Sequence, residues 1–318
     1  MLTVFLALFS ASFARAAGWV LHAHVPAAVR NLTPVDRLDA AKHLGLAISL
    51  PLRNPEGLTN LLREIYDPAS TNYHHYLTTE QFTERFGPGL ADYQKVADFM
   101  TSNGFTVTQT YANRLVLDVD ASVADIERTF HINLRVFNHP TESRTFFAPD
   151  TDPTLDVDLP VLQVNGLDNF VLPRPASLHI TPAGQASRAM PFNGSGTNGT
   201  YIGSDFRKAY VPNVSLNGAG QTVGLFELDG YFPGDITTYK SQAGLPNIPI
   251  SNVLINYNGA AGGNNDEVAL DIDMAMSMAP GLNGVIVYEG TDPNSVLARM
   301  ASDNQAKQLS CSWGWGET

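Results

Sequence analysis

The last third of the chain alternates apolar runs with segments of helical periodicity, and this alternation constrains the fold more than any other feature. Strands separated by helices are typical of βαβ units, which build a parallel sheet. In such sheets the catalytic side chains gather near the carboxyl ends of the strands. The expected strands cover 221–231, 251–257, 284–290 and 307–315, and the expected helices cover 236–244, 264–281 and 294–306.

The region before residue 170 mixes short strands and amphipathic helices in a different pattern. Hairpins and crossovers occur together, which favours an α+β sandwich with an antiparallel sheet. Thr78 and Gln81 form a capping-box pattern at the start of one helix. The expected strands cover 19–25, 43–52, 105–121 (two strands) and 132–137, and the expected helices cover 57–66, 77–87, 91–104 and 122–131.

Residues 1–17 have the features of a signal peptide. An apolar stretch runs from Leu2 to Phe9, and Ala14-Arg15-Ala16 is an A-x-A cleavage site. The stretch is too short to span a bilayer. No Lys or Arg precedes it, so a buried N-terminal strand or helix is the alternative. The sequence thus predicts a secreted protein, extracellular or periplasmic.

The expected domain organisation follows from changes in composition. Residues 18–172 form an N-terminal domain, and 201–318 form a part with a parallel sheet. Residues 173–200, rich in Pro, Gly, Ser and Thr, form a linker that offers a processing site. The net charge of −12 argues against nucleic acid as a partner, because nucleic acid needs a basic face. A single cysteine, Cys311, excludes an internal disulfide.

The helix expected at 264–281 carries an unusual set of acids. Its apolar stripe includes Val268, Ile272 and Met276, and its polar face, expected to meet water, carries Asp266, Asp273 and Ser277. Glu267 and Asp271 lie one turn apart and away from that polar face. Two carboxylates at this spacing repel by about 0.2–0.5 kcal/mol when exposed, and burial raises the pKa of one of them. Acids near a helix N-terminus also favour the helix dipole, so the spacing alone leaves a functional and a structural interpretation open.

Several motifs resemble the sedolisin family, the serine-carboxyl peptidases that include kumamolisin. The segment "GGNNDEVALDIDMAMSMAPGLNGVIVYEG" resembles the one that bears the catalytic Glu and Asp of that family, and Glu267, Asp271 and Ala279-Pro280-Gly281 match in order and spacing. "LSCSWGWGET" resembles the strand that lines the substrate cleft, at Ser312, Trp313 and Gly314. Upstream, "YHHYLTTEQFTERFGP", "NRLVLDVDASVADIERTF" and "VNGLDNF" resemble the pro-kumamolisin activation domain.

This resemblance implies a ferredoxin-like propeptide followed by a subtilisin-like α/β domain. It also implies an acid-acting endopeptidase with a Ser nucleophile, in which Glu267 is the general base, Asp271 orients Glu267, and a further Asp stabilises the oxyanion. A carboxylate suits acid conditions, since a histidine base is protonated near pH 4. The implied partners are a protein or peptide substrate and the propeptide, which packs on its own catalytic domain. No membrane partner is expected after signal cleavage.

The sequence also departs from the family. The family's nucleophile lies in a G-T-S motif after the Ser-Trp-Gly strand. The family's oxyanion Asp also lies after that strand. Neither the motif nor that Asp is found in this sequence. The family's calcium site is expected in the same later region. We therefore expect a propeptide joined to the N-terminal part, 201–318, of an incomplete peptidase domain. By itself such a chain is expected to be inactive and to bind no metal or cofactor.

The sequence leaves two other functions to consider. A stand-alone propeptide-like inhibitor or chaperone of a related protease remains the main alternative. A glycosidase using two acids is disfavoured, because glycosidase carboxyls flank the substrate at about 5–9 Å, whereas an i, i+4 pair lies on one side. His74 and His75 lack a second cluster of ligands nearby, so the sequence predicts no metal site there.

Overall fold

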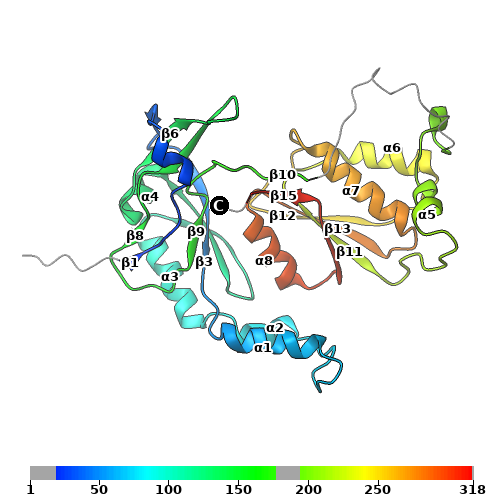
Figure 1. The fold of residues 1–318 in the computed structure, drawn as a ribbon, viewed down its shortest axis with the longest axis horizontal. Helices are drawn as coiled ribbons and strands as arrows, with labels where there is room; N and C mark the ends of the chain where they lie inside the picture. Colours follow the sequence, from blue (N-terminus) through cyan, green and yellow to red (C-terminus); the bar gives the residue numbers. More distant parts are fainter. Residues whose placement is uncertain (1–18, 177–193, 317–318) are drawn as a thin grey trace, which may run out of the picture.

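The computed structural model describes residues 19–176 and 194–316 and shows a mixed α/β protein with a parallel sheet (Figure 1). The expected signal peptide, 1–17, and most of the expected linker lie outside the described residues. An N-terminal half, blue to green in Figure 1, lies beside a C-terminal half, yellow to red.

The N-terminal half is built on an antiparallel sheet in the order β4-β5-β3-β9. The antiparallel sheet predicted from the sequence is thus confirmed. Helices α3 and α4 pack on it, and their apolar stripes share one core with Leu46, Ile48 and Leu117 of the strands. The elements are β3 (His43–Ser49), α3 (Leu90–Ser102), β4 (Thr106–Thr110), β5 (Val116–Ser122), α4 (Val123–Phe130) and β9 (Gln163–Asn165).

The two faces of this sheet have different neighbours. Strand residues alternate between faces, so Leu46 and Ile48 of β3 point into the N-terminal core, while Ala47 belongs to the core of the C-terminal half. On β5, Leu117 points to the first core and Val116 to the second. The sheet is therefore covered on one side by its own helices and on the other by the C-terminal half.

Smaller elements extend the N-terminal half. Helices α1 (Pro55–Tyr66) and α2 (Thr79–Arg85) enclose a separate apolar cluster around Phe86. The capping box predicted at the start of α2 is present, since Thr78 and Gln81 exchange hydrogen bonds. The remaining elements are β1 (Trp19–Val20), η1 (Ala27–Asn31), β2 (Asp36–Arg37), β6 (Leu134–Asn138), β7 (Thr145–Pro149) and β8 (Thr154–Leu155).

The C-terminal half contains the predicted parallel sheet, in the order β12-β13-β11-β14. All four strands fall within the ranges expected from the sequence except for a shift at the start of β12. The elements are η2 (Thr197–Gly199), α5 (Ser204–Tyr210), β11 (Thr222–Glu227), α6 (Pro233–Ala243), β12 (Ile250–Ile255), α7 (Asn265–Met278), β13 (Gly284–Gly290), α8 (Pro293–Asp303) and β14 (Gln308–Cys311).

One crossover of this sheet has an uncommon hand. The chain moves from β11 to the edge strand β12 and then back to β13, so two right-handed crossovers would place α6 and α7 on opposite faces. The two helices instead pack against each other, with Tyr239 of α6 hydrogen-bonded to Ser277 of α7 at 3.1 Å. One of the two connections is therefore left-handed. This placement brings α7 over β11 and β13.

The prediction that one face of α7 is polar and meets water is largely wrong. Asp266 is exposed, but Asp273 is half-buried and Ser277 is fully buried. The reason is that α5 and α6 cover this side of the helix. Burial raises the pKa of Asp273 to about 7, with a further contribution from the charge of Asp235. A helical-wheel argument from one segment cannot anticipate such neighbours.

The two halves meet at two places. Helix α8 packs against β5, in the centre of Figure 1. Strand β10 (Arg174–Pro175) pairs antiparallel with β15 (Trp313–Gly314). The first contact joins the antiparallel sheet to a helix, and the second brings the end of the N-terminal half to the Ser-Trp-Gly segment.

None of the helices in the described part of the chain is both long and apolar enough to cross a membrane.

The buried imidazole of His24 makes the N-terminal half sensitive to acid. Its Nε2 accepts from the backbone N–H of Val164 at 3.0 Å, and its Nδ1 lies 3.0 Å from the carbonyl oxygen of Leu21, so the ring is neutral. Desolvation lowers the pKa of His24 from the ordinary value of 6.5. Stability is therefore complete above pH 6.5 and is lost as the pH falls toward the lowered pKa.

We predict that His24→Gln flattens this pH dependence, because glutamine stays neutral and its oxygen still accepts a hydrogen bond. The wild-type free energy of unfolding should fall by up to about 1.4 kcal/mol per pH unit within that window. Urea unfolding followed by circular dichroism between pH 8 and pH 5 measures it. His22→Gln is the control, since the His22 side chain is exposed. An unchanged slope in His24→Gln contradicts the assignment.

Candidate active site

A group of carboxyl side chains gathers at the carboxyl ends of the parallel strands. Glu227 is the last residue of β11, and α7 brings Glu267 and Asp271 over the same end of the sheet. Ser312 and Trp313 follow β14 and complete the group. The acid pair predicted from the sequence and two of the three predicted cleft residues thus lie in contact or within electrostatic reach of one another.

Glu267 lies in the first turn of α7 and is buried, with 2% of its surface exposed. Its Oε2 accepts no hydrogen bond in the described part of the chain. Burial raises the pKa of Glu267, and the charge of Asp271 one turn away raises it further. A carboxyl with a free oxygen and a raised pKa is a competent proton acceptor for a neighbouring hydroxyl.

Asp271 is half-buried and is fixed by Ser312. The Ser312 hydroxyl donates to Asp271 Oδ1 at 2.9 Å, whereas Oδ2 is buried and accepts no hydrogen bond from an amide, a hydroxyl or a cation of the described residues. Desolvation raises the pKa of Asp271, and the hydrogen bonds from Ser312 and Glu227 oppose that rise. Ser312, expected only to line the cleft, therefore also orients one of the two acids.

Glu227 joins this group from the sheet and is fully buried. Trp313 Nε1 donates to its Oε2 at 2.8 Å, while Oε1 has no donor in the described part. Burial raises the pKa of Glu227 to about 9, and the charges of Asp271 and Glu267 add to the effect. Glu227 is therefore protonated at neutral and acid pH, and its proton supplies the donor that Asp271 otherwise lacks.

These contacts form one chain of proton donors. Trp313 donates to Glu227, protonated Glu227 donates to Asp271, and Ser312 donates to the other oxygen of Asp271. No Lys, Arg or His of the described residues forms an ion pair with any of the three carboxyls. Their charges are thus limited by shared protons rather than by cations.

Sequence reasoning missed Glu227. An available signal was its position, since it is an acid at the end of the apolar run "QTVGLFE", where a buried strand meets the catalytic edge of a parallel sheet. The role of the Trp313 indole was also missed, because a donor and its buried acceptor separated by 86 positions show no pattern in the sequence.

The Ser-Trp-Gly segment is occupied by the end of the N-terminal half. Arg174 pairs with Gly314 and Pro175 with Trp313 in an antiparallel bridge. The backbone N–H of Ala176 donates to the carbonyl oxygen of Ser312 at 2.7 Å. Gly314 thus has an extended backbone beside it, in the manner of a sheet edge that binds a peptide by strand addition.

Comparison with known families finds similarity in both halves of the chain. The model of the pro-kumamolisin activation domain matches residues 30–170, which cover the antiparallel sheet and its helices. Proteins similar to the chain over both halves carry the names of one peptidase family.

The chain is similar to the sedolisin family. It is 26% identical to xanthomonalisin of Xanthomonas sp. strain T-22, over 89% of the chain and 36% of that protein. It is 23% identical to sedolisin of Pseudomonas sp. strain 101, over 91% of the chain and 51% of that protein. Kumamolisin of Bacillus sp. strain MN-32 is 24% identical, over 76% of the chain and 45% of that protein.

The chain thus spans about half or less of the length of these relatives. Among the residues that the structure describes, no cluster of three or more His, Cys, Asp or Glu side chains is arranged to hold a metal ion. The absence of a cofactor remains a prediction, as do the roles of Glu267, Asp271, Ser312, Trp313 and Gly314.

We predict that the C-terminal half loses stability as the pH rises. The pKa of Glu227 is raised from 4.5 to about 9, so its contribution is complete below pH 4.5 and is lost as the pH rises through 9. The free energy of unfolding should fall by up to about 1.4 kcal/mol per pH unit for this proton. Tryptophan fluorescence during urea unfolding at pH 5, 7 and 9 measures it.

Glu227→Gln should remove most of this dependence, since glutamine accepts from Trp313 and donates to Asp271 as protonated glutamate does. The matched control is Asp266→Asn, an exposed acid in the same region. If both variants keep the wild-type slope, Glu227 does not hold the proton.

Proposed function

We propose that the chain is the zymogen form of a secreted, acid-acting serine-carboxyl endopeptidase, with its propeptide and the N-terminal part of its peptidase domain. The observation that carries the proposal is the buried group of Glu227, Glu267 and Asp271 beside Ser312 and Trp313. The similarity to the sedolisin family also supports this proposal. No G-T-S motif occurs in the 318 residues, so we propose that this chain has no peptidase activity by itself.

The proposed roles follow from the contacts. Glu267 is the general base, because its free Oε2 can accept the proton of a serine hydroxyl. Asp271, held by Ser312 and by the proton on Glu227, lies one turn from Glu267 and in its ionised form stabilises the protonated base. A carboxylate base remains effective in acid, where an imidazole base is already protonated.

The N-terminal half is proposed to be a ferredoxin-like propeptide, residues 18–172. Its order β4-β5-β3-β9, with a helical crossover from β3 to β4 and α4 after β5, supports this, since it is the order of a split βαβ arrangement. The linker, 173–200, is the proposed processing site. Residues 201–318 are the proposed start of a subtilisin-like domain.

The propeptide is also proposed to block the cleft. Arg174, Pro175 and Ala176 lie along the Ser-Trp-Gly segment as an added strand, so they occupy the position of a peptide substrate. The Arg174 guanidinium forms an ion pair with Glu142 of the N-terminal half at 2.6 Å. This contact favours a zymogen over a stand-alone inhibitor, because the segment binds a cleft in its own chain.

We predict that Glu267→Gln and Asp271→Asn each lower peptidase activity by about 10²–10⁴-fold, the range expected for loss of a general base or its support. The variants are made in a protein extended by the family's G-T-S region and assayed on denatured protein from about pH 3 to 6, since burial raises the pKa of Glu267 and the ionised base becomes more populated as the pH rises. Asp266→Asn, on the exposed side of α7, is the control and should keep full activity. Wild-type activity in either test variant contradicts the roles.

A second prediction concerns the strand that occupies the cleft. Ala176→Pro removes the N–H that donates to Ser312. It should weaken the β10–β15 contact and speed cleavage of the 173–200 segment by an added protease several-fold. Ala176→Gly keeps the N–H and is the matched control. Mass spectrometry of timed digests gives the rates, and equal rates for the proline variant and wild type count against the contact.

A further inference from the structure

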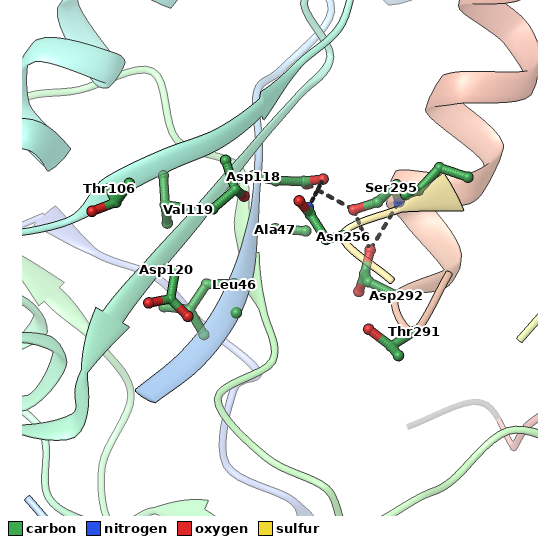
Figure 2. Close-up of a pocket in the computed structure, with 13 residues that line it drawn as sticks. Leu46, Ala47, Thr106, Asp118, Val119, Asp120, Asn256, Thr291, Asp292 and Ser295 are labelled. Atoms are coloured by element: carbon green, nitrogen blue, oxygen red, sulfur yellow. Dashed lines mark hydrogen bonds between the residues drawn. The ribbon is translucent and has the colours of Figure 1, made fainter. Parts of the chain in front are cut away.

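A second polar site lies between the two halves, away from the candidate active site. Figure 2 shows this pocket, which has a volume of about 480 Å³. Strands β3, β4 and β5 line one side, and the end of β12 and the start of α8 line the other. Asp118, Asp120 and Asp292 give it an acidic character.

Asp118 is the polar contact across this junction. It lies on the face of β5 that packs against the C-terminal half and is 3% exposed. Its Oδ1 accepts from Ser295 Oγ of α8 at 2.7 Å, and its Oδ2 accepts from Asn256 Nδ2 at 2.7 Å. Tyr111 of its own half donates to Oδ2 at 2.6 Å. Figure 2 shows Asp118 pointing toward Ser295 and Asn256.

The contact between Asp118, Ser295 and Asp292 has one hydrogen-bond donor too few when both carboxyls are ionised. Ser295 Oγ lies 2.7 Å from Asp118 Oδ1 and 3.0 Å from Asp292 Oδ1, but a hydroxyl donates only one hydrogen. Asp292 also accepts from the backbone N–H of Ser295 at 2.9 Å, as the N-cap of α8. A proton on Asp118 donates to Ser295 Oγ, and the Ser295 hydroxyl then donates to Asp292. Both short contacts are satisfied when one of the two acids is protonated, and the N-terminus of α8 favours the charge on Asp292, its N-cap, so the proton is assigned to Asp118.

The surroundings supply no cation to replace this proton. In the described ranges, no Lys, Arg or His forms an ion pair with Asp118 or Asp292. The N-terminal half presents the neutral phenols of Tyr93 and Tyr111, and β12 ends in the neutral amide of Asn256.

The other charged groups lie on the wall of the pocket or on α8. Asp120 lies on the same wall but is engaged by His43 of β3 at 2.5 Å. Burial raises the pKa of Asp118 and of Asp292, and the charge of Asp292 raises that of Asp118 further.

We propose that the junction of Asp118, Ser295 and Asp292 is a proton-dependent latch that holds the N-terminal half on the C-terminal half more tightly in acid than at neutral pH. Its regulatory meaning rests on the proposed propeptide role of the N-terminal half. When the halves separate, Asp118 meets water and returns to its ordinary acidity. The latch is therefore complete below the ordinary pKa of an aspartate, about 3.9, and weakens as the pH rises through the raised pKa.

Two measurements on the full chain test the latch. The first is the pKa of Asp118, from carboxyl ¹³C shifts of aspartate-labelled wild-type protein. The second is the opening of α8, from amide hydrogen exchange over 291–296, divided by the intrinsic rate at each pH. Opening should increase by up to about tenfold per pH unit as Asp118 ionises, the limit for one proton.

Asp118→Asn should flatten this dependence, since its amide nitrogen donates to Ser295 while its oxygen accepts from Tyr111 and Asn256. Asp120→Asn, in the same pocket and on the same strand, is the control and should keep the wild-type slope. An Asp118 pKa at or below the ordinary value, greater opening in acid, or an unchanged slope in Asp118→Asn overturns the latch. The wild-type titration decides even if the variant does not fold. Neither readout uses peptidase activity, so failure of the latch and failure of the proposed function are separate results.

Discussion

The burial of carboxyl groups without cationic partners is the constraint on which the rest of the structure depends. Glu227 and Glu267 are 0% and 2% exposed, and no ion pair reaches them from the described residues. Burying such a group in its charged form costs several kcal/mol, so the group keeps a proton or shares one. Protonation of Glu227 therefore stabilises the C-terminal half. The fold achieves this by directing α7 across the carboxyl ends of the parallel strands, where Trp313 and Ser312 provide the donors.

A buried carboxyl without a cationic partner also contributes to the docking of the N-terminal half on the C-terminal half. A β-strand has two faces, and the central strand β5 uses one for its own core and the other for the C-terminal half. Val116 contributes apolar surface to the second face, and Asp118 contributes its polar contacts. A buried acid at such a contact adds specificity, because a shifted register would leave it without its donors. Docking of the N-terminal sheet is thus determined by position along one strand.

The sequence allowed the local elements and the acid pair to be predicted, but not their long-range partners. The helical and alternating periods of α3, α7, β5 and β11 are strong local signals, and these elements were predicted correctly. Strands β7 and β9 were missed, because they are short and are defined by partners far along the chain. The Glu267–Asp271 spacing was visible within one helix. The bonds from Trp313 to Glu227 and from Ser312 to Asp271 cross 86 and 41 positions, so they depend on the order of the strands.

Acid acts on the two halves in opposite directions. The buried, neutral imidazole of His24 accepts a hydrogen bond from Val164, and protonation in acid breaks that bond. Glu227 and Asp118, whose pKa values are raised by burial, are instead stabilised by the protons that acid supplies. A fall in pH therefore strengthens the carboxyl cluster and the contact between the halves while it weakens the interior of the N-terminal half.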